Sequence, residues 1–289
     1  MNTLQIVWKT AWRSVLVALA YIVGLVLSGV MGVLIGWQTA SGSGSRQSLI
    51  WLLLSIVLLG AFLGPLASQL KLSRMQHFFL WGSLIIFNLG SVAFEGAYFA
   101  PDLVTTPVPV LLAQQLLASA GAALMITVLF APAGFSFSWT EALSTRPWYS
   151  WLWRFIVSSF SYLVFYFVFG GLNYSLVTKP YYESHAGGLT VPAPEVVVVL
   201  ESIRGVLIVF SILLFLLSAR GTQRQLMART GWLLFAIGGI IPLMWQINTL
   251  PLFLLIASGI EIFFQNFCTG GVAAWLMGIE GEAKGISGT

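Results

Sequence analysis

The chain is a succession of long apolar runs separated by short polar segments. Eight runs carry few charged residues and reach or approach the length of a membrane-crossing helix: residues 14–37, 49–70, 77–99, 108–130, 151–172, 196–218, 231–247 and 251–277. About 20 apolar residues form a helix that crosses roughly 30 Å of hydrocarbon. The pattern therefore predicts an all-α integral membrane protein, a bundle of about eight transmembrane helices.

The first run, and the boundary between the seventh and eighth runs, each allow two interpretations. Lys9 and Arg13 precede the first run, as in a signal peptide, but residues 14–37 exceed the roughly 7–15 residues of a signal-peptide core. We therefore expect an uncleaved first helix. Only Asn248-Thr249-Leu250 separates the seventh and eighth runs. We expect a tight helical hairpin there, with a re-entrant pair as the alternative, and a kink at Pro242 inside the seventh run.

The basic residues predict the orientation of the helices. With the N-terminus inside, the inner side collects ten basic residues: Lys9, Arg13, Lys71, Arg74, Arg146, Arg154, Arg220, Arg224, Arg229 and Lys284. The outer side collects only Arg46 and Lys179. Cytoplasmic loops carry an excess of Lys and Arg. We therefore expect both termini in the cytoplasm (N-in/C-in), in a multi-pass protein of a bacterial cytoplasmic membrane.

Two segments between the runs are longer than the others. The outer segment 173–195 contains Lys179-Pro180, Gly187-Gly188 and Pro192-Ala193-Pro194, so an irregular loop is expected. The inner segment 133–150 is rich in Phe, Trp and Tyr. Aromatic side chains favour the headgroup layer, which predicts an interfacial anchor; a docking surface for a partner is the alternative.

The two halves of the chain show similar patterns. Trp12-Arg13, Tyr21 and Gly29 recur at the same spacing as Trp153-Arg154, Tyr162 and Gly170. This favours one transmembrane domain, 1–289, built as a 4+4 parallel repeat with halves 1–132 and 147–289, an arrangement known among transporters. Trp-Arg pairs are also ordinary at helix ends, so independent helices remain the alternative.

Composition agrees with the membrane assignment and excludes several functions. Of the 289 residues, 58% are hydrophobic and 8% are charged, against roughly 25% charged in soluble domains; mean hydropathy is +0.93. The net charge of +4 is explained by topology, so no nucleic-acid partner is expected. Cys268, His77 and His185 are too few for a usual metal or haem site. No phosphate-binding or dinucleotide motif occurs, and we expect no cofactor.

The polar residues inside the runs are the candidate site. Counting about 1.5 Å per residue from the helix ends places Arg204, Glu261 and Asn88 near the membrane midplane. Glu201 lies one turn above Arg204, and the polar residues Glu95, Gln114 and Gln115 lie nearer the outer face. This distribution predicts a polar funnel that opens outward.

The balance of charges in the funnel indicates what it could bind. An arginine stays protonated in a protein, so Arg204 requires a carboxylate; Glu201 is the local candidate and Glu261 the cross-helix one. The remaining carboxylate then binds a cation, a proton or a polar group of a ligand, unless the cluster only fixes the helices. Asn88, Gln114 and Gln115 also fit interhelical hydrogen bonds. Glu95 and Asp102 also fit solvated positions at the rim.

Three functions agree with these features. The first is transport or binding of a small or amphipathic solute through the funnel. The second is a structural or assembly subunit that contacts other membrane protein subunits. The third is a membrane-embedded enzyme on a lipid-linked substrate, with Glu95, Asp102 or Glu201 as acid or base. The scarcity of histidine and cysteine disfavours the enzyme, and no catalytic residue is assigned.

The topology is testable with single cysteines. In a Cys268→Ala background, a cysteine introduced at Ser73 should react with a membrane-impermeant reagent only after the inner face is opened, because residues 70–76, 133–150 and both termini are expected inside. Labelling of that cysteine from outside in intact cells contradicts the orientation.

Overall fold

The computed structural model describes residues 3–36, 46–101, 106–132, 137–185 and 188–279. Within these residues the chain is helical and contains no strand. The elements are α1 (Thr3–Leu34), α2 (Arg46–Gln69), α3 (Arg74–Phe99), α4 (Val108–Phe130), α5 (Trp139–Ser144), α6 (Trp148–Phe165), η1 (Tyr166–Gly170), α7 (Gly171–Asn173), η2 (Tyr174–Thr178), α8 (Lys179–Glu183), α9 (Pro194–Ser218), α10 (Gln223–Phe235), η4 (Ala236–Ile240), α11 (Ile241–Trp245) and α12 (Leu252–Met277).

Eight helices in the described residues are long and apolar enough to cross a membrane. Six are single α-helices, and two are composite: α6 to α8, and α10 to α11. Large apolar side chains such as Val23, Leu124 and Phe160 are more than half exposed on their outer faces. So much exposed apolar surface is typical of helices that face lipid. The eight predicted helices are thus confirmed as elements, and they indicate a multi-pass membrane protein.

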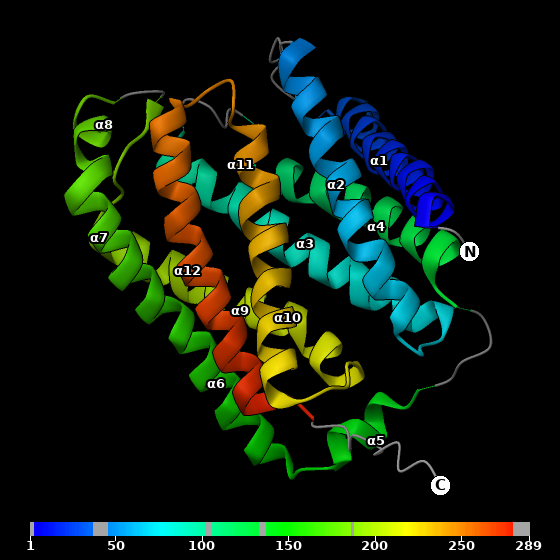
Figure 1. The fold of residues 1–289 in the computed structure, drawn as a ribbon. Helices are drawn as coiled ribbons and strands as arrows, with labels where there is room; N and C mark the ends of the chain where they lie inside the picture. Colours follow the sequence, from blue (N-terminus) through cyan, green and yellow to red (C-terminus); the bar gives the residue numbers. More distant parts are fainter. Residues whose placement is uncertain (1–2, 37–45, 102–105, 133–136, 186–187, 280–289) are drawn as a thin grey trace, which may run out of the picture.

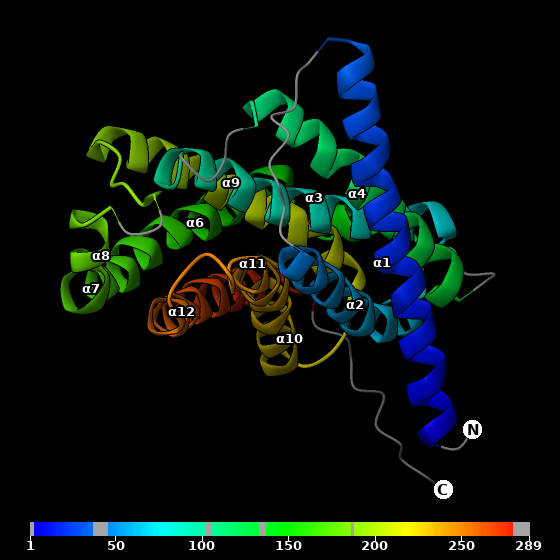
Figure 2. The ribbon, with the colours of Figure 1, turned by 90° about the horizontal axis from the view of Figure 1, so that it is seen from above.

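The helices form one bundle with a similar contact pattern in each half. In the first half, α1 packs on α2 and α4, and α3 packs on α4. In the second half, α6 packs on α9 and α12, and α10 packs on α12. The halves meet where α3 contacts α9 and where α2 contacts α11. Figures 1 and 2 show α1 on one side of the bundle and the α6-to-α8 helix on the opposite side.

Small residues allow a close approach between α1 and α4. A methyl group at Gly24 would lie 2.6 Å from the backbone of Ala118, and one at Gly121 would lie 2.6 Å from the carbonyl oxygen of Ala20. Close backbone contact through Gly and Ala is typical of helix pairs in membranes, where dispersion rather than the hydrophobic effect drives association. The α1–α4 pair therefore depends on the absence of side chains at both glycines.

Matching links join α2 to α3 and α9 to α10. Four residues separate each pair, and each link has a basic residue second, Lys71 or Arg220. Ser73 and Thr222 then form capping boxes with Gln76 and Gln225. These caps satisfy backbone N–H groups that the first helical turn leaves without partners.

The second half departs from the expected boundaries in the fifth crossing. Helix was expected to end near residue 172, but it continues through η1, α7, η2 and α8 to Glu183. The expectation of an irregular segment was therefore wrong for residues 173–183. Pro180 does not end the helix because it lies in the first turn of α8, where a missing N–H costs no intrahelical hydrogen bond.

A kink was expected at Pro242, and the structure has a π-helical turn just before this residue. Segment η4 ends two residues before Pro242, and α11 continues the helix to Trp245. Both α10–α11 and α12 have membrane-spanning length, which favours the hairpin over a re-entrant pair. Hydrogen bonds from the N–H groups of Thr249 and Leu250 to the Gln246 carbonyl close the connection.

The aromatic segment 133–150 is partly folded onto the bundle. Residues 133–136, including Phe135, lie outside the described residues. Trp139 in α5 donates from Nε1 to Ser218 Oγ at 2.9 Å. Trp148 and Tyr149 are 75% and 61% exposed, as expected of side chains that lie in a headgroup layer. Part of the segment thus packs on the bundle, and part has exposed aromatic groups.

The α1–α4 packing predicts unequal effects of two glycine substitutions in α1. Gly24→Ala should lower the free energy of unfolding by about 1–3 kcal/mol, because the added methyl group overpacks the contact. Gly29→Ala is the control, since no atom lies within 4 Å of its added methyl group. Denaturant unfolding of both variants in micelles measures the difference, and equal stability of the two would contradict the packing.

Candidate functional site

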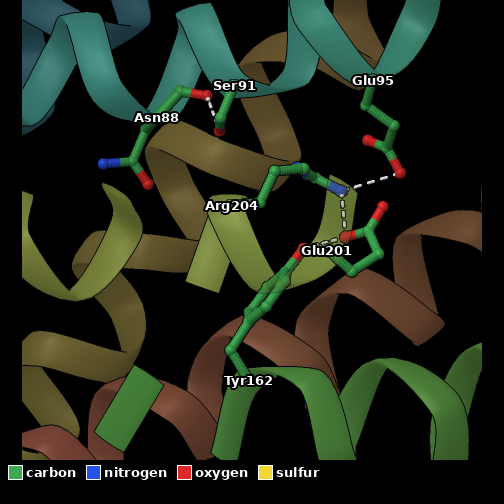
Figure 3. Close-up of polar contacts among 6 residues, drawn as sticks. All are labelled: Asn88, Ser91, Glu95, Tyr162, Glu201 and Arg204. Atoms are coloured by element: carbon green, nitrogen blue, oxygen red, sulfur yellow. Dashed lines mark hydrogen bonds and ion pairs between the residues drawn. The ribbon is translucent and has the colours of Figure 1, made fainter. Parts of the chain in front are cut away.

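Arg204 lies between two carboxylates inside the bundle. Its Nη1 is 2.7 Å from Glu95 Oε1 on α3 and 2.8 Å from Glu201 Oε2 on α9 (Figure 3). Glu201 is fully buried and Arg204 is 6% exposed. The predicted contact between Glu201 and Arg204 is confirmed, as their i,i+3 spacing required.

Tyr162 of α6 supports this cluster from the opposite side. Its hydroxyl donates to Glu201 Oε2 at 3.1 Å, and its ring centroid lies 5.6 Å from Arg204 Cζ. Gly205 lets α6 and α9 approach closely, because a methyl group there would lie 2.6 Å from the Ser159 carbonyl oxygen. The cluster therefore joins α3, α6 and α9 through charge, hydrogen bonding and ring contact.

A cavity of about 360 Å³ borders the cluster. Its walls come from α3, η1, α8, α9, the α10–α11 helix and α12. The polar and aromatic lining residues are Glu95, Arg204, Glu261, Gln246, Thr249, Ser258, Gln265, Asn266, Phe99, Tyr166, Tyr182 and Trp245. Apolar walls with a few convergent polar groups are typical of small-molecule sites.

The cavity runs deep along the bundle. Its lining on α12 extends from Leu254 to Asn266, which corresponds to about 18 Å at 1.5 Å per residue. At the shallow end it is lined by Leu189, Thr249 and Leu250, in connections at the end opposite the N-terminus of α1. A polar cavity is therefore present, and its floor at Gln265 and Asn266 lies deeper than the sequence suggested. That it opens to the outer face stays a prediction.

Glu261 lies on the cavity wall apart from Arg204. Its Oε2 accepts a hydrogen bond from Asn173 Nδ2, and a methyl group at Gly170 would lie 3.0 Å from its Oε1. In the described residues no Lys, Arg or His lies within ion-pair distance of Glu261. Glu261 is therefore the carboxylate of this site that has no cationic partner within the described chain.

The expectation that Glu261 is the cross-helix partner of Arg204 was wrong. Glu261 was expected to pair with Arg204 and Glu95 to lie near the rim, but Glu95 makes the ion pair. Counting about 1.5 Å per residue from a helix end assumes that the helix stands upright in the membrane, and it ignores the rotation of the helix about its own axis. The α3 and α9 helices pack directly on each other, and this contact brings Glu95 to the arginine.

Two π-helical turns, η1 and η4, border the cavity. Tyr166 begins η1, Asn173 lies between η1 and η2, and Gly238 lies in η4; Tyr166 and Gly238 line the cavity. A π turn widens the helix, and such turns recur at functional sites. Here η1 places Gly170 and Asn173 against Glu261, while η4 places Gly238 against two amides.

Of those amides, Asn266 lines the floor of the cavity, whereas Asn88 lies near Gly238 and is not among the lining residues. A methyl group at Gly238 would lie 3.0 Å from Asn266 Nδ2 and 3.4 Å from Asn88 Oδ1. Asn88 Nδ2 donates to Ser211 Oγ at 2.9 Å and to the Leu84 carbonyl at 2.8 Å. Its buried Oδ1 has no hydrogen-bond partner in the described residues. Asn88 thus joins α3 to α9 and keeps one acceptor for a polar group.

The two glutamines of the fourth run do not reach the cavity. Gln115 accepts the hydroxyl hydrogen of Tyr21 at 2.7 Å, between α1 and α4. Gln114 is half-buried on α4 and is not among the lining residues. They were assigned to the funnel only because of their expected depth, and they lie on α4 in the first half of the bundle. Asp102 lies outside the described residues.

Sequence reasoning gave no role to several lining residues. Gln265-Asn266 is a polar pair within an apolar run, which is a usable signal for an interior position. Tyr166 and Asn173 carried no such signal, because their placement depends on the π turns. In the described residues no group of three His, Cys, Asp or Glu side chains is arranged to hold a metal ion.

Comparison of the chain with protein-family models, curated proteins and solved structures found no match.

The shared nitrogen of Arg204 predicts how the cluster tolerates substitution. Arg204→Gln should destabilise by about 3–5 kcal/mol, because it leaves two buried carboxylates without their cation. Arg204→Lys should lose less, since both ion pairs use one nitrogen.

Glu201→Gln in the Arg204→Gln background should recover part of the loss by removing one uncompensated charge. Thermal unfolding in micelles measures the series. Equal losses for Arg204→Lys and Arg204→Gln, with no recovery in the double variant, contradict a charge-balanced cluster.

Proposed function

We propose that this protein binds a small or amphipathic solute in the polar cavity and moves it across a membrane. The observation that carries the proposal is the roughly 18 Å deep cavity with Glu261 on its wall and the Arg204 cluster beside it. Such depth exceeds half of a roughly 30 Å hydrocarbon layer. A solute in it would be shielded from lipid for much of the crossing.

The charge inventory indicates the kind of solute. The site holds three carboxylates but one guanidinium: Glu95 and Glu201 pair with Arg204, and Glu261 lies on the cavity wall apart from it. A charged side chain near the bilayer centre costs on the order of 2.5–3.5 kcal/mol on insertion scales. A cationic or hydrogen-bond-donating group beside Glu261 would offset part of that cost. We therefore assign Glu261 as the carboxylate that binds the solute and the Glu95–Arg204–Glu201 cluster as its support.

The aromatic walls support the same assignment. Tyr166, Tyr182 and Trp245 line the cavity together with Glu261. Aromatic faces attract cations, more strongly when water is excluded, and their edges also pack against alkyl groups. A carboxylate beside such rings is suited to an alkylated ammonium group.

The proposed orientation places both chain ends in the cytoplasm and the cavity mouth outside. The helix directions gather Lys9, Arg13 and the basic residues around the α2–α3, α5–α6 and α9–α10 connections at one end of the bundle. This excess matches the positive-inside pattern. We propose the bacterial cytoplasmic membrane as the location.

A 4+4 duplication is part of the proposal. The contacts of α1, α2, α3 and α4 correspond to those of α6, α9, α10 and α12, including the two that join the halves. Tyr21 and Tyr162 occupy matching positions on α1 and α6 and are both buried, although their acceptors lie on helices that do not correspond, α4 and α9. Transporters commonly place the substrate site where two such repeats meet.

Glu261→Gln tests the binding role. The variant should fold with equal or higher stability, because a costly charge is removed, yet lose the stabilisation that a bound ligand gives by mass action. The probes are n-alkylammonium chlorides of increasing chain length, at neutral and mildly acidic pH, and the readout is the unfolding temperature. Glu195→Gln, at an exposed position on α9, is the control and should respond as wild type does.

Two results would contradict the proposal. The first is a wild-type protein that no alkylammonium ion stabilises, which removes the cationic solute. The second is a response that survives unchanged in both Glu261→Gln and Glu201→Gln, which makes the cluster a scaffold. Uptake of the best stabilising amine into proteoliposomes, compared between wild type and Glu261→Gln, then separates transport from binding alone.

A further inference from the structure

A second cavity, of about 370 Å³, lies at the opposite end of the bundle. It is formed by the last turns of α2 and α9, by the links that follow these two helices, by Phe137, and by one residue of α10. The residues that line it are Leu66, Gln69, Leu70, Lys71, Phe137, Phe215, Ser218, Ala219, Arg220 and Arg229. We call it the basic pocket, after Lys71, Arg220 and Arg229.

The basic pocket has charges of one sign. Its three ionisable lining residues are cations, and none of its lining residues is Asp or Glu. All three residues are exposed, so water screens part of their mutual repulsion. The excess of positive charge still favours a negatively charged occupant.

The pocket also fixes its central cation in place. Arg220 Nη1 donates to the carbonyl oxygens of Leu217 at 2.7 Å and Ala219 at 3.0 Å. Its Cζ lies 5.2 Å from the centroid of the Phe137 ring, and Arg229 Nη1 donates to the Arg220 carbonyl at 3.4 Å. A guanidinium held by backbone and ring contacts is preorganised to bind an oxyanion.

The remaining wall of the basic pocket is apolar, and the pocket lies near the ends of two long apolar helices. Leu66, Leu70 and Phe215 face the same space as the cations. Lys71 and Arg220 each lie two residues beyond the end of a helix of membrane-spanning length, α2 or α9, at the level expected for lipid headgroups. A pocket that is basic on one side and apolar on the other suits a phosphate together with the glycerol and upper chains of a lipid.

We propose that the basic pocket binds the phosphate headgroup of an anionic phospholipid on the cytoplasmic side. Basic pockets between transmembrane helices recognise such headgroups. Lys71 belongs to the first half of the chain and Arg220 and Arg229 to the second, so one headgroup would bridge the halves. The inference rests on membrane insertion in the proposed orientation and is independent of what the polar cavity binds.

The test compares two double variants of equal charge. Lys71→Gln/Arg229→Gln removes two pocket cations and leaves Arg220, which also holds backbone carbonyls. Arg74→Gln/Arg224→Gln removes two basic residues from the first turns of α3 and α10 that do not line the pocket. Each protein is purified in a non-ionic detergent at constant ionic strength and titrated with phosphatidylglycerol or phosphatidylcholine.

Wild type and the Arg74/Arg224 variant should be stabilised by phosphatidylglycerol and not by phosphatidylcholine. The Lys71/Arg229 variant should need at least roughly tenfold more phosphatidylglycerol for the same rise in unfolding temperature. Native mass spectrometry should find fewer retained phosphatidylglycerol molecules on that variant. Single variants Lys71→Gln and Arg229→Gln provide the same comparison where the double variant does not fold.

Three outcomes overturn the proposal. Equal weakening in both double variants means that diffuse surface charge attracts the lipid. Equal stabilisation of wild type by the two lipids means that the headgroup charge is not recognised. Saturation by inorganic phosphate or glycerol phosphate at the concentration that phosphatidylglycerol needs means that the pocket takes a soluble anion.

Discussion

A guanidinium that keeps its charge inside an apolar bundle constrains the surrounding helices. Arg204 stays protonated, so carboxylates must lie within ion-pair distance wherever water is excluded. Glu201 lies on the same helix as Arg204, so it needs no other helix to reach the guanidinium. Glu95 reaches Arg204 only if α3 crosses α9 at one position, and Tyr162 reaches Glu201 only if α6 packs against α9. These contacts hold the central helices in register, and the polar cavity opens next to them.

The tyrosines at matching positions in the two halves make different contacts. Tyr21 donates to the neutral Gln115 between α1 and α4, whereas Tyr162 donates to the charged Glu201 between α6 and α9. The first pair fills a packed interior, and the second lies beside the cavity. On the proposed duplication, the second half supplies Arg204, Glu201 and Glu261, and the first half contributes Glu95 to the same site. Neutral hydrogen bonds cost little in a bilayer, whereas charges are kept where they have a use.

Irregular backbone is concentrated on one side of the molecule. In the described residues the π turns η1, η2 and η4 all belong to the two composite helices that border the polar cavity. Membranes tolerate such backbone where it is buried in protein or lines a water-accessible space. The turns let Gly170 and Gly238 approach Glu261 and the amides of Asn266 and Asn88 without a side chain between them.

The sequence by itself determined the helices, because 20-residue apolar runs have few other stable forms in lipid. It also determined the Glu201–Arg204 pair, since residues three apart share a helix face. Tertiary structure alone decided that Glu95 and not Glu261 completes the ion pair, and that Gln115 packs in the other half. It also decided that residues 173–183 are helical. Depth counted along a run gives height but not tilt or rotation, and these are fixed only when helices pack against one another.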